Sequence, residues 1–379
     1  MTLRAARRMD GIERTLIRRI FDAAPPGSIN LGLGQPDLPT PPRACLAGIE
    51  GIAAGKTAYT STAGDPALRA AIAARYPWCA SGPANVVVTI GSQEAVFATV
   101  LTMVDPGDEV LVPDPGYPAY PVVARLVGAT PVAYPLRPER AFRLDASDIE
   151  RRLTPRTRLV IVCSPSNPTG AVDPAAEVDS LAELLRHRGI PWLSDEIYGG
   201  FVYDSPARSL SQAAPEGGLV VSGVSKDMSM TGWRIGWVVG PEPVVARIIA
   251  AHQYVVTCAP SVSQAAALVA VSKDAEADRV AALSVFRRRR ALMHAELARI
   301  PGLAPALPDG AFYFFVDVSR FGDSIALAER VLARRRVITI PGEAFGPGGA
   351  GFLRISYAAS EEAIREGVRA LGEELAGRP

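Results

Sequence analysis

Runs of consecutive apolar residues alternate with amphipathic stretches along most of the chain. Short continuous apolar runs are typical of strands covered on both faces, and apolar positions three or four residues apart are typical of helices. Strands are predicted at 86–90, 109–112, 159–163, 191–194, 219–222 and 235–239. Helices are predicted between them, including 93–103, 175–187 and 244–254. Strands that alternate with helices predict an α/β fold with a mostly parallel sheet flanked by helices.

The order of elements changes near residue 280. The elements predicted beyond it are a long Arg-rich helix, a strand at 312–318, a helix, strands at 337–340 and 352–357, and a final helix. This order predicts a separate, smaller α+β domain formed by the N- and C-terminal segments. The predicted divisions are an N-terminal arm with part of the small domain at 1–45, a large domain at 46–280 and the small C-terminal domain at 281–379.

The N-terminus is rich in arginine, which is also typical of a transit peptide. Asp10 and Glu13 interrupt the positive charge, and apolar residues recur there at helical spacing. These apolar residues are Ile12, Leu16, Ile17, Ile20 and Phe21. We therefore expect an amphipathic helix rather than a targeting segment, and a cytoplasmic protein.

Composition favours a globular enzyme that acts on small molecules. The 379 residues include 48% hydrophobic and 21% charged residues, and 40 basic residues balance 39 acidic ones. A net charge of +1 provides no global field for a polyanion, so neither nucleic acid nor a membrane surface is an expected partner. Four dispersed cysteines without a C-x-x-C pair and three dispersed histidines argue against a metal site or a disulfide framework.

Only three of the basic residues are lysines. Lys56 lies in a G-x-x-x-G-K-T sequence, one residue shorter than a phosphate loop, and no apolar strand leads into it. A nucleotide hydrolase is therefore a remote alternative. Lys273 lies in a polar stretch typical of a solvated surface.

Lys226 differs from the other two lysines, because it follows the predicted strand 219–222 and precedes a stretch rich in glycine and aromatic residues. A lysine in a low-dielectric cleft beside another cation, such as Arg234, has its ammonium form disfavoured. It can then act as a neutral amine nucleophile. The pattern predicts Schiff-base chemistry at Lys226.

Besides the segment around Lys226, four segments lie at or near predicted strand ends, where open α/β sheets bind ligands. Together with one motif towards each end of the chain they make seven, at 30–37, 91–95, 114–120, 166–170, 194–198, 225–234 and 352–357. With these motifs in family order, nearly the whole chain resembles the class I/II, aspartate aminotransferase-like, pyridoxal-phosphate-dependent aminotransferases of fold type I. The resemblance implies a seven-stranded-type sheet in the large, cofactor-binding domain and pyridoxal 5'-phosphate as cofactor.

The resemblance implies that the protein moves an amino group from an L-amino acid to a 2-oxo acid, expected to be 2-oxoglutarate, by a ping-pong aldimine/ketimine mechanism. Lys226 would form the internal aldimine, and Arg234 would clamp the cofactor phosphate. The backbone N–H groups of Ser92 and Gln93 would meet that phosphate at a helix N-terminus. An ordinary N-cap is the alternative interpretation of Ser92.

Three further roles at the cofactor ring are implied by the resemblance. Asp195 would keep the pyridine nitrogen protonated, with Glu196 as the alternative. Asn167 and Tyr198 would donate to the phenolic oxygen, although the asparagine segment is also compatible with a plain turn. Tyr117 would stack on the ring, and a core or loop tyrosine is the alternative there.

The remaining roles concern the substrate and the neighbouring subunit. Arg354 lies in an apolar strand, where a buried cation needs a partner anion. The resemblance makes that anion the substrate α-carboxylate, with Asn167 and the backbone N–H of Gly34 nearby, and a structural ion pair is the alternative. Tyr59 would reach the phosphate of the neighbouring subunit, which implies a homodimer.

The chain departs from the family pattern at Gly223, where many relatives carry a phosphate-binding serine. Ser225 or Ser222 is expected to substitute. The same cofactor apparatus also serves lyases and decarboxylases, so these stay alternatives to a transaminase. Neutral or aromatic amino donors are favoured, and aspartate stays open.

Overall fold

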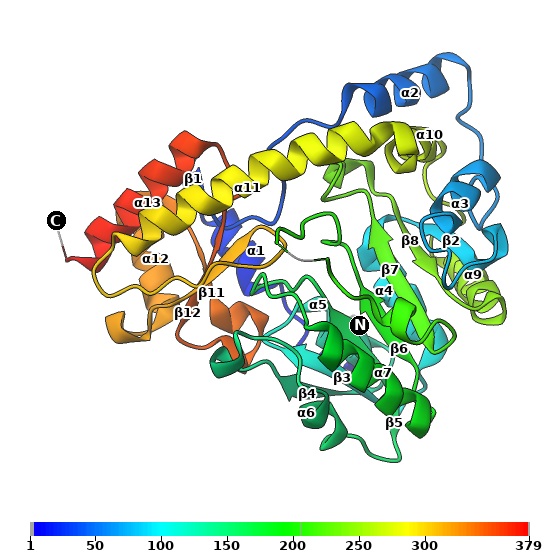
Figure 1. Cartoon of the computed structure of the whole chain (residues 1–379), viewed down its shortest axis with the longest axis horizontal. Coiled ribbons are helices and arrows are strands. Elements are labelled where there is room, and N and C mark those ends of the chain that lie inside the picture. The colour runs from blue at the N-terminus through cyan, green and yellow to red at the C-terminus, as the bar shows by residue number, and fades with distance from the viewer. Residues whose placement is uncertain (1–3, 205, 378–379) are drawn as a thin grey trace.

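The computed structural model describes residues 4–204 and 206–377 and divides the chain between a large sheet with its helices and a smaller group of elements at one side (Figure 1). The long helix α11 (Glu276–Ala298) runs from the helices beside the large sheet to the smaller group. The divisions predicted at 1–45, 46–280 and 281–379 stay a prediction, and residues 1–3 and 378–379 of them lie outside the described residues.

The large sheet has seven strands in the order β2-β8-β7-β6-β5-β3-β4. They are β2 (Val86–Thr89), β3 (Glu109–Asp114), β4 (Thr130–Pro135), β5 (Thr157–Cys163), β6 (Trp192–Asp195), β7 (Gly218–Gly223) and β8 (Gly236–Val239). Only β8 runs antiparallel to its neighbours β2 and β7. The mostly parallel seven-stranded sheet confirms the predicted fold class.

Both faces of this sheet are buried. Val87, Val110 and Leu193 pack on one face, whereas Val86, Val88 and Leu111 pack on the other. Successive side chains of a strand point to opposite faces, so strands covered on both sides are apolar throughout. This is why six of the strands were predictable as continuous apolar runs.

Helices cover the two faces of the large sheet and extend from its edges (Figure 1). The longer ones are α2 (Pro42–Ala53), α4 (Gly91–Met103), α7 (Ala175–Arg188), α9 (Glu242–Val256) and α10 (Ser261–Val271). The shorter ones are α3 (Pro66–Ala73), α5 (Ala119–Leu126), α6 (Ala146–Glu150) and α8 (Leu210–Ala213). The predicted helices 93–103, 175–187 and 244–254 fall within α4, α7 and α9.

The smaller group contains an antiparallel sheet in the order β11-β12-β9 and a two-stranded parallel pair, β1-β10. Its strands are β1 (Ile29–Asn30), β9 (Tyr313–Asp317), β10 (Val337–Ile338), β11 (Ile340–Pro341) and β12 (Phe352–Ser356). Its helices are α12 (Ser324–Arg335) and α13 (Glu361–Leu375). Because β1 pairs with β10 and Leu31 joins the apolar core of this group, residues 29–31 of the N-terminal segment are part of it, whereas Ile20 of the same segment packs in the core of the large sheet.

The N-terminal helix is shorter than its apolar pattern predicts. Helix α1 spans Leu16–Asp22, because Thr15 caps it by accepting a hydrogen bond from the backbone N–H of Arg18 at 3.2 Å. Ile12 therefore lies outside the helix. Within residues 4–204 and 206–377, none of the helices has both the length and the apolar character needed to cross a membrane.

Candidate active site

A cavity of about 310 Å³ opens at the carboxyl ends of the central parallel strands. All the predicted site residues except Tyr59 line it: Gly34, Ser92, Gln93, Tyr117, Asn167, Asp195, Tyr198, Ser225, Lys226, Arg234 and Arg354. Tyr59 is 86% exposed and does not line the cavity of its own chain. The fold thus gathers residues from widely separated motifs into one site.

Lys226 follows β7 and reaches into this cavity, where its Nζ donates to the backbone oxygen of Gly34 at 2.7 Å. Burial is the main cause that lowers the pKa of Lys226 to about 8; the positive charges of Arg354 and Arg234 act in the same direction, and Asp195 acts against them. The neutral amine is therefore more accessible near physiological pH than in an ordinary lysine, in line with the chemistry predicted for it.

Asp195 ends β6 and lies in the same cavity as Lys226. Its Oδ2 accepts from the hydroxyl of Tyr120 at 2.8 Å, and burial raises its pKa to about 6. Glu196 points elsewhere, since it accepts from the hydroxyls of Ser194 and Ser209 and lines a different cavity. The geometry therefore favours Asp195 over its neighbour for the role at a cofactor ring.

Sequence reasoning missed Tyr120. It is fully buried and lies only three residues after Tyr117, within the motif 114–120. A tyrosine in an apolar helix gives the same signal as an ordinary core residue, so its contact with Asp195 required the tertiary structure.

An anion-binding end is formed by the first turn of α4 and the guanidinium of Arg234. Arg234 Nη2 donates to the backbone oxygen of Ile90 at 3.4 Å, next to the helix start at Gly91. A Cβ on Gly91 would lie 2.4 Å from this nitrogen, so a larger residue there would displace the guanidinium from its place against the helix. The helix dipole, the first-turn N–H groups and the arginine together favour an anion here.

The serines named in the sequence analysis occupy different positions at this end of the cavity. The N-cap of α4 is Ile90, so Ser92 is a residue of the first turn and not an ordinary cap. Ser225 lines the cavity and is buried, whereas Ser222 donates to the backbone oxygen of Glu196 and lines the neighbouring cavity. Of these two serines, Ser225 is therefore the one that lines the cavity of Lys226.

Arg354 is 2% exposed, yet no carboxylate within the described parts of the chain pairs with it. Its Nη1 donates to Asn167 Oδ1 at 2.7 Å and its Nη2 to the backbone oxygen of Gly32 at 2.5 Å. The predicted alternative, a structural ion pair, is thus not found among these residues. A buried cation that lacks an anion is suited to a carboxylate supplied by a ligand.

Tyrosines form the remaining wall of the cavity. The hydroxyl of Tyr117 donates to Gln93 Oε1 at 3.0 Å, and the ring of Tyr117 contacts Tyr120 edge-on. The hydroxyls of Tyr198 and Tyr313 are 2.7 Å apart. Tyr313 was not predicted as a site residue, because it lies in the apolar run 312–318 that also reads as core.

A partly neutral lysine amine between an anion-binding helix start and a buried arginine is suited to amine chemistry on a carboxylate substrate. Together with the sheet, this cavity defines an enzyme of fold type I that transfers amino groups. The sequence profile of the family "Aminotransferase class I and II" matches residues 26–371. The chain belongs to this family and is a transaminase.

Named relatives have different substrates in their names. The chain is 38% identical to a "Probable aspartate/prephenate aminotransferase" of Aquifex aeolicus over 92% of this chain and 91% of that protein. It is 38% identical to an arginine–pyruvate transaminase of Pseudomonas aeruginosa over 89% of this chain and 88% of that protein. Membership of the family therefore does not identify the amino donor.

Solved structures agree closely with the fold. Thermus thermophilus aspartate aminotransferase with maleate matches with a TM-score of 0.93 and 33% identity, covering 98% of this chain and 100% of that one. The aromatic aminotransferase of Pyrococcus horikoshii matches with a TM-score of 0.89 and 31% identity, covering 95% of this chain and 99% of that one.

Proposed function

We propose that this transaminase uses pyridoxal 5'-phosphate and transfers the amino group of a neutral or aromatic L-amino acid to 2-oxoglutarate. The observation that carries the proposal is the position of Lys226, which lies in one cavity with the first turn of α4, Arg234, Asp195 and Arg354. When bound, the cofactor supplies an electron sink that makes the α-proton of the substrate acidic. The rest of the reaction depends on side chains of the chain itself.

The cavity residues fit such a cofactor. The α4 start, Ser225 and Arg234 would hold its phosphate. Asp195, whose buried carboxyl has a raised pKa, gains a counter-charge from a protonated ring nitrogen. Asn167 and Tyr198 would bind its phenolic oxygen. Tyr117 would cover one face of the ring.

Lys226 would anchor the cofactor and then serve as the general acid and base that moves the substrate α-proton. Its lowered pKa suits that work, because a base must be unprotonated at the operating pH. Arg354 would hold the α-carboxylate, and the backbone of Gly34 would help to orient it.

The lining of the cavity supports a neutral amino donor. Its cations within the described residues are Lys226, Arg234 and Arg354. Each of them would serve the cofactor or the α-carboxylate. An adjoining cavity of about 820 Å³ has mostly apolar side chains in its wall. It shares five residues with the first cavity: Ile17, Leu33, Gln93, Tyr117 and Arg234. A donor with an apolar side chain would extend into this space.

2-Oxoglutarate needs a partner for its second carboxylate. Arg18 lines the adjoining cavity and is paired with Asp22 at 2.9 Å, with 64% of its side chain exposed. Arg18 can exchange this surface partner for a ligand at little cost, because exposed ion pairs contribute about 0–1 kcal/mol. We propose that it binds the distal carboxylate of the acceptor.

We propose a homodimer with Tyr59 reaching the neighbouring site. This tyrosine and the apolar side chains Leu46, Ile49 and Ile52 of α2 are more than half exposed in the single chain. Apolar side chains grouped on one helix face are typical of a surface that another chain covers.

The test is a panel of amino donors assayed with 2-oxoglutarate after the purified protein has been incubated with pyridoxal 5'-phosphate. Donor alone should convert the visible cofactor band to a stable pyridoxamine form, and the acceptor should restore it. A lyase or decarboxylase would instead release ammonia or carbon dioxide without that stable form. Nucleotide hydrolysis in the absence of a cofactor band would contradict the proposal; Lys56 is exposed and lies outside the cavity.

A further inference from the structure

Two aromatic rings flank the guanidinium of Arg354. Its central carbon lies 4.4 Å from the ring centre of Tyr313 and 4.6 Å from that of Phe345. Tyr313 is placed there by strand pairing: Arg354 in β12 is opposite Phe315 in β9, and Tyr313 is two residues away on the same face. Such diagonal neighbours in antiparallel strands are within reach of long side chains.

This arrangement holds the cation without neutralising it. Aromatic faces attract a cation through their quadrupole and add no net charge. A carboxylate in the same place would pair with the guanidinium and compete with an incoming substrate carboxylate. The rings therefore fix Arg354 and leave its charge for the ligand.

The hydroxyl of Tyr313 contacts Tyr198 and lies close to Gly34. It is hydrogen-bonded to the hydroxyl of Tyr198 at 2.7 Å, and both groups are buried. It also lies close to Gly34, where an added Cβ would be 2.2 Å from the hydroxyl oxygen. One side chain thus touches the guanidinium, the Gly34 backbone and Tyr198.

We propose that Tyr313 is a positioning residue with two separable functions. Its ring holds Arg354 in place for the substrate α-carboxylate. Its hydroxyl donates to Tyr198 and strengthens that tyrosine as a donor to the phenolic oxygen of the cofactor, because hydrogen bonds in a chain polarise one another. The inference rests on the proposed function, since it assumes a bound cofactor.

Three variants separate the two functions. Tyr313→Phe removes the hydroxyl and keeps the ring, Phe345→Leu removes the second ring, and Tyr313→Leu removes both ring and hydroxyl of Tyr313. Two properties are measured on the cofactor-loaded protein. The first is the pH midpoint of the visible absorption change without substrate, and the second is the apparent Kd of L-glutamate and L-phenylalanine in single-turnover reactions.

Tyr313→Phe should move the absorption midpoint to higher pH by a few tenths of a unit, because a weaker donor stabilises the more negative form of the cofactor less. Its apparent Kd for the amino acids should stay within about twofold of wild type. Phe345→Leu should raise that Kd about threefold to thirtyfold and leave the midpoint unchanged. Tyr313→Leu should show both effects.

An unchanged midpoint in Tyr313→Phe would overturn the role of the hydroxyl. A rise in Kd in Tyr313→Phe as large as in Tyr313→Leu would overturn the role of the ring. If Tyr313→Leu does not fold, as judged by circular dichroism, the other two variants still decide both points. A wild-type protein without a cofactor band would contradict the proposed function itself, so the two failures are distinguishable.

Discussion

Burial moves the pKa values of the two central ionisable groups toward each other. The pKa of Lys226 falls to about 8 and that of Asp195 rises to about 6, since a low-dielectric cavity disfavours an ammonium and a carboxylate alike. Pairs of groups whose pKa values are moved close to the operating pH are typical of sites that transfer protons.

Replacement of Lys226 tests its role as amine. Lys226→Ala and Lys226→Arg should lose the visible cofactor band, and turnover should fall by at least about 10³-fold, because neither residue supplies a neutral amine. The measurements are the absorption spectrum with cofactor and the rate with a donor and 2-oxoglutarate. Lys273→Ala is the matched control, because Lys273 is exposed and lies outside the cavity. A fully active Lys226→Ala would refute the assignment.

The lowered pKa of Lys226 also predicts how fast the cofactor-free protein captures the cofactor. The neutral amine is the reactive form, so the rate should rise as the pH rises through about 8 and level off above it. An ordinary lysine would still be gaining rate near its usual pKa of about 10.4. Stopped-flow absorbance at a series of pH values measures this, and a rise centred near 10 would show that burial does not activate Lys226.

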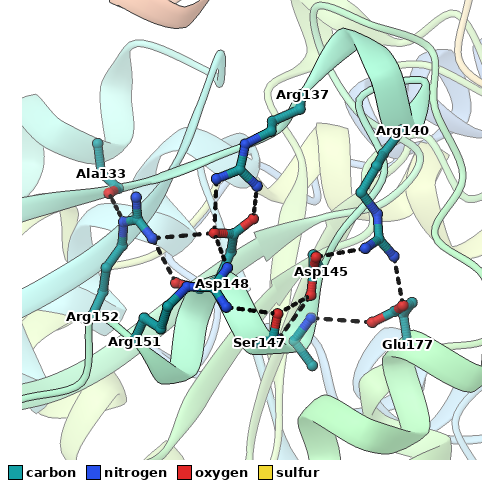
Figure 2. A network of polar contacts seen from close by, with 10 residues as sticks. Ala133, Arg137, Arg140, Asp145, Ser147, Asp148, Arg151, Arg152 and Glu177 are labelled. Atoms are coloured by element: carbon teal, nitrogen blue, oxygen red, sulfur yellow. Dashed lines mark hydrogen bonds and ion pairs between the residues drawn. The ribbon is translucent and has the colours of Figure 1, made fainter.

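At the scale of elements, a network of charged side chains holds α6 at the edge of the large sheet (Figure 2). Asp148 is 1% exposed and accepts hydrogen bonds from Arg137, Arg151 and Arg152. Arg152 also donates to the backbone oxygen of Ala133 in β4 at 2.9 Å. Figure 2 shows these arginines converging on the one carboxylate.

Arg140 extends the same network to α7, because it pairs with Asp145 at 2.5 Å and with Glu177 at 2.8 Å. Asp145 in turn caps α6 by accepting from the backbone N–H of Ser147. The network therefore ties α6 both to the edge strand β4 and to α7.

Asp148→Asn should lower the free energy of unfolding by about 1–3 kcal/mol at neutral pH, because three arginines lose a shared buried carboxylate. The hydrogen bond from Arg137 holds the pKa of Asp148 below its usual value. Its contribution is therefore complete above the ordinary aspartate pKa and is lost as the pH falls through the lowered one. Urea unfolding of both proteins from pH 7 down to pH 3 should show their stabilities converging at low pH.

The matched control is Asp179→Asn. Asp179 pairs with Arg208, and about half of its side chain is exposed, so the change should cost less than about 1 kcal/mol. Equal losses in the two variants, or a constant difference between Asp148→Asn and wild type at every pH, would contradict the assignment.

Strands were predictable from the sequence where both faces of the strand are fully buried. Strand β4 was missed, because it is an edge strand with two prolines and only one buried residue, and so it has no continuous apolar run. The run 337–340 was predicted as one strand but is divided into β10 and β11, which belong to different sheets. A change of sheet partner within four residues does not alter the pattern of apolar residues, so the sequence does not reveal it.

The site was predictable to the extent that motifs carry polar residues at strand ends. Lys226, Asp195 and Arg354 stand out in apolar surroundings, where burial of a charged side chain costs free energy unless the charge is paired. Tyr120 and Tyr313 do not stand out, because an aromatic residue in an apolar run is as typical of a core. Their partners depend on tertiary placement, which one sequence does not encode in a local pattern.

At the scale of the whole molecule, α2 lies at the periphery beside α10 and carries Leu46, Ile49 and Ile52 at an exposure of 55%, 59% and 60% (Figure 1). Their spacing of three residues places them on one helix face. If this face is covered in a homodimer, Ile49→Glu should convert a species of twice the chain mass to a monomer in analytical ultracentrifugation. Val280→Glu, at a similarly exposed position on α11, should leave the mass unchanged, and a monomeric wild type would contradict the dimer.

An active site built from residues of both chains can be tested with two inactive variants. In a mixture of Lys226→Ala and Tyr59→Ala chains, half of the randomly formed dimers contain one of each. If Tyr59 serves the neighbouring site, one site of every mixed dimer has both the lysine and the tyrosine, so about a quarter of the wild-type activity should return at limiting cofactor. If Tyr59 serves its own chain, every site of the mixed dimer lacks one of the two residues and the mixture stays as inactive as its parts. Assays before and after joint refolding of the two variants measure this, with each variant refolded alone as the control.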